Sequence, residues 1–509
     1  MVQGEGRVPN IVIVMADQLA PHFTGTYGHP MVKTPHLDAL AARGMRFDNA
    51  YCNAPLCAPS RFAFMSGQLP TRIAAYDNAS DFPATVPTYA HHLRLAGYRT
   101  VLSGKMHFVG PDQLHGFDER LTTDVYPADY GWTPDWEAPD DRIDGFYHNM
   151  DSVRGACRAV ASVQLDFDEE TAFAALRRIN DLRRRDEHPF LLVASFTHPH
   201  DPYEARPEFF DLYDHDAVPM PDVHLPYEAQ DPFSQRIIDG IEANGAGVTE
   251  AQVRMARHAY FANVTYVDAM LGRIVGALEE TGQLDDTVIL FTADHGEMLG
   301  ERGLWYKMNF FEHSARVPLV MAGPGVLRGT HGGACSLIDV LPTLLDIAGG
   351  GGAPGQPIDG RSLWPVATGT GEGHDEAIGE YCAEMAGAPV FMIRRGRWKY
   401  VHCDRDPPQL YALDTDPREL TNLAAEPAHA KTAAAFAREV AGRWDCAKVK
   451  ADVIATQKQR RLVHAALMSG ARNPWDHQPK RDASNEYVRS HITWFDAAVS
   501  KVIKATPSP

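Results

Sequence analysis

Uninterrupted apolar segments alternate with helical patterns along most of the chain, and this alternation constrains the fold more than any other feature. Residues 10–16 (Asn-Ile-Val-Ile-Val-Met-Ala) form the first segment, which is typical of a strand buried on both faces. Further strands are predicted at 99–103, 189–196, 287–292 and 317–321. Helices are predicted at 34–44, 86–96, 167–185, 250–280 and 337–347. Such alternation predicts an α/β fold with a doubly wound, mostly parallel sheet.

The sequence changes character after about residue 370. Short, closely spaced strands at 390–394, 397–402 and 409–413 predict an antiparallel meander, and a helix is expected near 428–447. We therefore expect a large domain at residues 1–370, a smaller antiparallel α+β subdomain at 371–451 and an extended tail at 452–509. The basic run 458–461 in that tail is interpreted as a solvated face.

Charge and cysteine content exclude several classes of protein. The chain has 48 Lys and Arg against 66 Asp and Glu, a net charge of -18, which argues against nucleic acid and anionic membranes as partners. Its seven cysteines are scattered and lack metal-finger spacing, which fits a reducing compartment. No apolar run of about twenty residues is present. We expect a soluble cytoplasmic protein.

Ionisable residues follow four of the predicted strands. In a doubly wound sheet, ligands bind beyond the carboxyl ends of the strands. Any one of these residues could be a solvated loop charge or a hydrogen-bonded buried histidine. Together they predict one site, built from Asp17, Lys105, His107, His198, His200, Asp294 and His295.

One short motif carries specific chemistry. Residues 57–61 read Cys-Ala-Pro-Ser-Arg, followed by Met-Ser-Gly at 65–67. From the residues alone, Cys57 could be a small buried thiol in a loop broken by proline. The motif, however, resembles that of the type I sulfatases of the alkaline phosphatase superfamily. In that family a formylglycine-generating enzyme converts the cysteine to formylglycine, whose hydrate offers two hydroxyls on one carbon.

The resemblance implies a divalent metal at the site. Its ligands would be Asp17, Asp294, His295 and the formylglycine oxygen at Cys57. Where the family has a second Asp, this chain has Gln18, which makes Gln18 a doubtful ligand. The family favours Ca²⁺; oxygen ligands also suit Mg²⁺, and the histidine also allows Mn²⁺.

The resemblance also implies a set of cationic groups around the sulfate: Arg61, Lys105, His107, His200 and Lys307. An alkyl alcohol is a poor leaving group, so a general acid is needed. His200 or Lys307 would take that role, and His107 would deprotonate the second hydroxyl to expel sulfate.

Longer stretches resemble the choline-sulfate-hydrolysing branch of the family, at 104–117, 130–136, 196–203 and 484–489. This implies choline-O-sulfate as the substrate. Residues 126–147 are rich in aromatic and acidic side chains, which suit a quaternary ammonium, although such aromatics could simply pack an irregular insertion. The resemblance makes these residues candidate choline contacts: Trp132, His148, Asn149, Glu384 as counter-charge, and Asp496 from the tail of a neighbouring subunit. We expect a homodimer or homotetramer.

Three other functions fit the same residues. Phosphonate monoester or phosphodiester hydrolases and arylsulfatases belong to the same superfamily. A protein of another class, a non-catalytic binder of quaternary-ammonium esters, would keep Cys57 unmodified.

Overall fold

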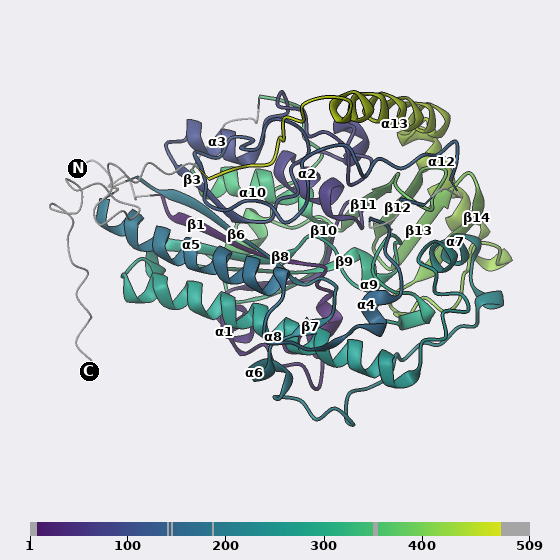
Figure 1. The fold of residues 1–509 in the computed structure, drawn as a ribbon, viewed down its shortest axis with the longest axis horizontal. Helices are drawn as coiled ribbons and strands as arrows, with labels where there is room; N and C mark the ends of the chain where they lie inside the picture. Colours follow the sequence, from purple (N-terminus) through teal and green to yellow (C-terminus); the bar gives the residue numbers. More distant parts are fainter. Residues whose placement is uncertain (1–7, 140–141, 144–145, 186–187, 350–354, 480–509) are drawn as a thin grey trace.

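An eight-stranded sheet forms the centre of the computed structural model, which describes residues 8–139, 142–143, 146–185, 188–349 and 355–479. The strand order is β10-β2-β9-β8-β1-β6-β3-β4 (Figure 1). Their bounds are β1 (Asn10–Asp17), β2 (Met45–Tyr51), β3 (Arg99–Gly104), β4 (Glu119–Arg120), β6 (Phe190–Pro199), β8 (Thr287–Ala293), β9 (Arg316–Ala322) and β10 (Gly329–Ser336). Only β9 runs antiparallel to its neighbours among these described strands. The predicted α/β fold with a mostly parallel sheet is confirmed.

Helices cover both faces of this sheet. Figure 1 shows the long helices α5 (Val163–Arg185) and α8 (Glu250–Glu280) below it, and α2 (Cys57–Ser66), α3 (Tyr89–Leu95) and α10 (Val340–Ile347) above it. Shorter elements complete the large domain: α1 (Pro35–Ala42), α4 (Asp151–Arg154), α6 (Pro207–Phe210), α7 (Pro232–Gly240), α9 (Glu312–Ala315), α11 (Trp364–Thr368), and the β5 (Cys157–Arg158) and β7 (Glu204–Ala205) pair.

The three central strands β1, β6 and β8 are buried along their whole length. Val12 of β1 lies between Leu192 of β6 and Ile289 of β8 in a parallel register. This register explains the uninterrupted apolar segments, because helices cover both faces of these strands. It also brings the carboxyl ends of the three strands to one edge of the sheet.

Three strands of the sheet were not predicted: the two-residue strand β4 and the longer strands β2 and β10. β10 contains Gly329, Gly332 and Gly333, and glycine is depleted in strands because it offers no side chain for packing. β2 carries polar residues on its less buried face and pairs with β9 and β10. Pairing with the neighbouring strands, rather than local propensity, determines both elements.

A four-stranded antiparallel sheet follows, as expected: β11 (Glu376–Tyr381), β12 (Val390–Arg395), β13 (Trp398–Cys403) and β14 (Asp406–Ala412). Helix α12 (Ala430–Arg443) packs on it, and helix α13 (Cys446–Met468) comes next. The boundary expected at residue 452 therefore falls inside a helix, so the first part of the expected tail is not extended. Residues 480–509 lie outside the described part.

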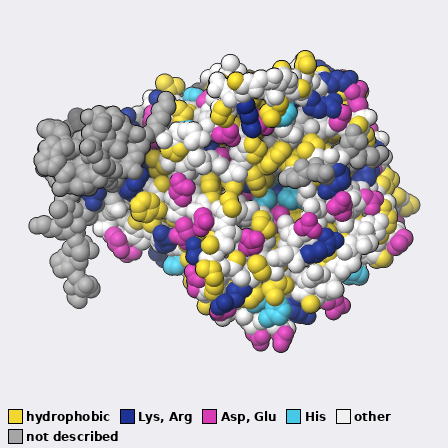
Figure 2. Space-filling view, in the orientation of Figure 1, with side chains coloured by type: hydrophobic (Ala, Val, Ile, Leu, Met, Phe, Trp, Pro, Cys, Tyr) yellow, Lys and Arg dark blue, Asp and Glu magenta, His cyan; other side chains and the backbone are white. Residues whose placement is uncertain are grey.

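The surface of the described residues carries both acidic and basic side chains. Figure 2 shows acidic and basic side chains interspersed over the visible face, with Lys and Arg gathered along the upper edge over α13. Within the described ranges, no helix is both long and apolar enough to cross a membrane.

Candidate active site

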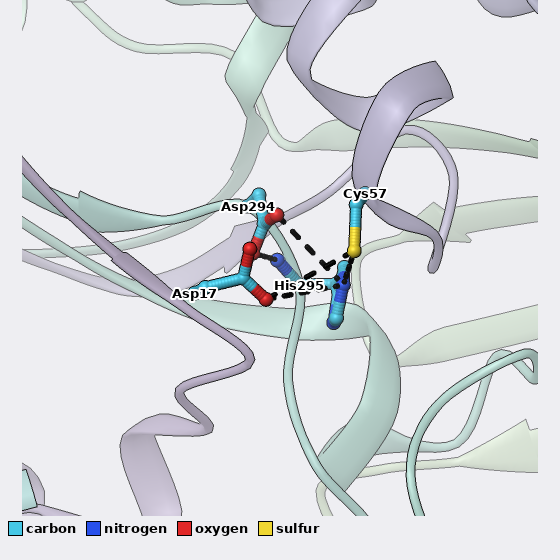
Figure 3. Close-up of side chains that lie close together, drawn as sticks. All are labelled: Asp17, Cys57, Asp294 and His295. Atoms are coloured by element: carbon cyan, nitrogen blue, oxygen red, sulfur yellow. Dashed lines mark hydrogen bonds and ion pairs between the residues drawn. The ribbon is translucent and has the colours of Figure 1, made fainter. Parts of the chain in front are cut away.

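Four predicted metal ligands meet at the carboxyl edge of the sheet (Figure 3). Asp17 ends β1, Asp294 and His295 follow β8 directly, and Cys57 is the first residue of α2. Their donor atoms all lie within 4.8 Å of one another, and the four residues are buried. The Cys57 sulfur is 3.2 Å from Nε2 of His295 and 3.9 Å from Oδ1 of Asp17.

The donor set fits a divalent cation. Two carboxylates and one imidazole converge on residue 57, a combination of oxygen and nitrogen ligands that suits a hard or borderline ion. Burial lowers the pKa of His295 to about 4, so its imidazole is neutral and has a free lone pair. Burial raises the pKa of the Cys57 thiol to about 12, with a further contribution from the Asp17 charge. The cysteine itself is therefore protonated near neutral pH.

Arg61 contacts both ligand carboxylates. Its Nε donates to Asp294 and its Nη2 to Asp17, each at 2.8 Å, and its Nη1 donates to Oγ of Ser195 at 2.9 Å. Lys105 forms an ion pair with the same Asp17. Although burial opposes ionisation, these cations hold the pKa of Asp17 well below its usual range. Arg61 thus orients the carboxylates, and direct sulfate binding by it stays a prediction.

A glycine places Lys105 beside the reactive position. Gly104 has φ +98°, and a Cβ there would lie 2.0 Å from the carbonyl oxygen of Ser195 in β6. Only glycine lets β3 approach β6 so closely in this left-handed conformation. The turn directs Nζ of Lys105 to 3.8 Å from the Cys57 sulfur and 4.2 Å from the centre of the Tyr126 ring.

His107 lies beside the aromatic side chains of the site. Its ring centre is 4.9 Å from that of Tyr126 and 5.8 Å from that of Trp132. Burial, reinforced by the Lys105 charge, lowers its pKa to about 3. Neither ring nitrogen has a hydrogen-bond partner among the described residues. The imidazole is therefore neutral and has an unpaired ring nitrogen, and its role as a base stays a prediction.

His200 and Lys307 form a second polar group. Nζ of Lys307 lies 2.8 Å from Nε2 of His200 and donates to Oε1 of Gln18 at 2.5 Å. Burial and the Lys307 charge lower the pKa of His200 well below its usual range. His198, in contrast, pairs with Asp168 at 2.7 Å. Its expected place in the cluster is wrong, because its side chain makes a separate buried hydrogen bond with Asp168.

A cavity of about 280 Å³ opens above Cys57. Trp132 in its wall stacks on Phe146, with ring centres 4.6 Å apart and planes 17° from parallel. The candidates Trp132, His148 and Asn149 all line the cavity with His200 and Lys307. The sequence reasoning missed other lining residues: Asn78, Ser152, Gln164 and Asp201. Of these, only Asp201 had a signal, since it directly follows His200.

Glu384 does not line this cavity. It is buried close to Tyr147, whose pKa is raised by burial and also by the Glu384 charge. Burial raises the pKa of Glu384 to about 7, and its Oε2 has no hydrogen-bond partner within the described ranges. The last candidate, Asp496, lies outside the described residues.

Comparison with known families agrees with this geometry. Residues 9–350 match the model described as Sulfatase, and residues 300–443 match the C-terminal model of N-sulphoglucosamine sulphohydrolase. The chain belongs to the sulfatase family, within the alkaline phosphatase superfamily. Residues 451–500 also match the model described as choline sulfatase enzyme C terminal.

Two individual relatives and one solved structure are also similar to this chain. A choline-sulfatase of Rhizobium meliloti (strain 1021) is 50% identical over 493 residues, which cover 95% of this chain and 96% of the relative. A multifunctional alkaline phosphatase superfamily protein of Trinickia caryophylli is 29% identical, covering 84% and 94%. Among solved structures, the phosphonate monoester hydrolase of Agrobacterium radiobacter has a TM-score of 0.70 at 27% identity, covering 87% of this chain and 96% of that one.

Proposed function

We propose that this protein hydrolyses choline-O-sulfate to choline and sulfate, with Cys57 converted to formylglycine. The observation that carries the proposal is the cavity above Cys57: Lys307 and an aromatic wall containing Trp132 line it, and the Lys105 ammonium lies 3.8 Å from the Cys57 sulfur. An anion and a quaternary ammonium at the two ends of one small substrate need this pair of surfaces. The choline-sulfatase relative supports the same reaction.

The chemistry assigns a role to each group. In the hydrated aldehyde, one hydroxyl gives its proton to Asp17 or Asp294 and displaces choline at sulfur. The second hydroxyl then loses its proton, so that the carbon–oxygen bond to sulfate breaks, sulfate leaves and the aldehyde re-forms. Lys307 protonates the choline oxygen, or His200 does so with a proton received from Lys307, and His107 takes the proton of the second hydroxyl. Lys105 balances negative charge beside residue 57. A divalent cation, calcium by family preference, would be held by Asp17, Asp294, His295 and residue 57 and would supply positive charge to the sulfate oxygens.

Turnover of choline-O-sulfate, followed as released sulfate, tests the function. The phosphonate monoester hydrolase likeness makes a phosphonate or phosphate diester the second candidate, so a phosphodiester and an aryl sulfate are compared in parallel. The proposal requires the highest kcat/KM for choline-O-sulfate. If peptide mass shows an unmodified Cys57 in protein made together with its maturation enzyme, and choline esters bind without turnover, the protein is a binder instead.

Trp132→Ala should weaken recognition of the trimethylammonium group. A desolvated cation–π contact contributes about 2 kcal/mol or more, so kcat/KM for choline-O-sulfate should fall roughly 30-fold. An aryl sulfate, whose aryl group carries no charge, lacks the cation and should lose much less. Equal losses for both esters would mean that Trp132 only packs against Phe146.

The KM for choline-O-sulfate should depend on pH through Glu384. Its pKa is raised to about 7, so the carboxylate is charged above that pH and neutral below it. As a counter-charge it would bind the cation best above pH 7, and KM should rise roughly fivefold between pH 7 and 6. Glu384→Gln should remove this dependence and leave the KM of an aryl sulfate, which has no cationic group, unchanged. A pH profile that is the same in Glu384→Gln would exclude the counter-charge role.

We further propose that the protein acts in the cytoplasm as a homodimer or homotetramer, after maturation by a formylglycine-generating enzyme. The match of residues 451–500 to the choline sulfatase C-terminal model supports a role for the tail in assembly. One tail aromatic is used within the protomer, however: Trp475 packs on Tyr130 with ring centres 5.2 Å apart. The remaining tail aromatics lie outside the described residues.

A further inference from the structure

The aromatic side chains of the cavity wall belong to a segment without regular secondary structure. Residues 126–139 form neither helix nor strand, yet they carry Tyr126 and Trp132. Helix α13 packs against this segment from outside. Oε1 of Gln457 accepts the backbone N–H of Trp136 at 2.9 Å, and the Gln457 side chain is buried. The wall therefore depends on α13 for its position.

Charge complementarity strengthens this contact. The acids of the segment pair with bases on or just after α13: Asp135 with Arg461, Glu137 with Lys458, and Asp129 with Arg472. These acids therefore face the helix, which differs from the interpretation that the acidic residues of the insertion serve the ammonium group. The interpretation of residues 458–461 as a solvated face is also wrong at Arg460, which is 6% exposed.

Arg460 connects α13 to the nucleophile. Its guanidinium forms a bidentate ion pair with the fully buried Asp77, at 2.6 and 2.7 Å. The next residue, Asn78, lines the cavity, and its Oδ1 accepts the backbone N–H of Ala58 at 2.9 Å. Ala58 directly follows Cys57 in the first turn of α2. Nη1 of Arg460 also lies 3.5 Å from Oγ1 of Thr133, beside Trp132.

We propose that Arg460 is a positioning residue that fixes residue 57 and the Trp132 wall relative to each other. It touches neither the substrate cavity nor the ligand cluster, and it acts through Asp77, Asn78 and the side-chain hydroxyl of Thr133. The planar fork of Arg suits this role, because it holds both carboxylate oxygens of Asp77 in one orientation. The part of the inference that concerns choline rests on the proposed function; the part that concerns residue 57 applies to any ester.

Arg460→Met tests the inference. Small displacements of a reacting group cost large factors in rate, so kcat should fall on the order of 10-fold or more for both choline-O-sulfate and 4-nitrophenyl sulfate. KM should rise for the choline ester alone. Amide hydrogen exchange should accelerate at Ala58 and over residues 126–139, which reports positioning without any turnover. Arg460→Lys keeps the charge but loses the fork, and should recover only part of the activity.

Matched variants separate positioning from general stability. Lys448→Met removes an exposed ion pair with Asp452 within the same helix, and should behave as wild type. The double variant Asp77→Asn/Arg460→Met leaves no buried charge without a partner. It replaces Arg460→Met in the same measurements if the single variant does not fold. It should lose no more activity than the worse single variant, since both act through one contact.

The inference is overturned if a folded Arg460→Met protein, or the double variant in its place, has wild-type kcat, KM and exchange rates at an equal formylglycine content. Failure of the proposed function looks different. If the wild-type protein does not hydrolyse choline-O-sulfate, the proposed substrate is wrong. The hydrogen-exchange rates and the kcat for the aryl sulfate still test the role of Arg460 in that case.

Discussion

Cys57→Ala should lose turnover on the order of 10⁴-fold or more, the largest loss that we expect from any single change. Alanine can provide neither the aldehyde nor a substitute nucleophile, and water would have to attack sulfur directly. Cys57→Ser should lose nearly as much. Because burial raises the pKa of the thiol to about 12, unconverted Cys57 has almost no thiolate at neutral pH and should be inactive as well.

Released sulfate measures this loss, and the mass of the peptide that contains residue 57 measures conversion. Across preparations, activity should rise in proportion to the formylglycine fraction. Cys157→Ser is a matched control, since Cys157 is exposed and lies away from the ligand cluster. Full activity in Cys57→Ala would show that the nucleophile is another group.

Asp294→Asn should reduce kcat/KM on the order of 10²-fold or more. The substitution removes one of two anionic ligands of a buried cation, and transition-state charge stabilisation by such a cation contributes several kcal/mol. It also removes the carboxylate that accepts Nε of Arg61 at 2.8 Å, leaving that buried guanidinium with one carboxylate instead of two. Exhaustive chelation of the wild-type protein should cause a comparable loss that added Ca²⁺ reverses.

A binding measurement that is independent of activity accompanies this prediction. A cation that binds only the folded state raises the melting temperature, so Ca²⁺ should raise Tm in wild type and much less in Asp294→Asn. Asp285→Asn is the control, because Asp285 is an exposed acid at the opposite end of β8. Full activity in the chelated protein would exclude a metal held by Asp294. Equal Ca²⁺-induced increases of Tm in wild type and Asp294→Asn would exclude it as well.

The parts of the site that could be predicted from the sequence are those fixed by strand ends and by a contiguous motif. Asp17 and Asp294 end buried parallel strands, and a parallel register brings such residues together whatever the intervening chain does. Family resemblance supplied the remaining candidates, such as Lys307, which lies in a loop with no periodic pattern. Asn78 carried no signal of either kind.

Arg460 shows why the rest could not be predicted. A basic run on a helix has the same pattern whether it faces water or an acidic loop more than three hundred residues earlier in the chain. Its partner Asp77 is 383 positions away, so only the folded structure identifies the pair. Similarly, the glycines of β10 argue against a strand locally, and parallel pairing with β2 overrides that preference.

The burial of Cys57 sets a time limit on its maturation. In the folded protein the Cys57 side chain is 1% exposed and all ten residues of α2 are buried, so another enzyme cannot reach the thiol. His295, whose Nε2 contacts the Cys57 sulfur at 3.2 Å, is synthesised 238 residues later. At about 5–20 residues per second, the ribosome needs roughly 10–50 s for that distance. If Cys57 is converted as proposed, conversion has to precede folding of the site, and the ratio of maturation enzyme to translating ribosomes would set the fraction of active molecules.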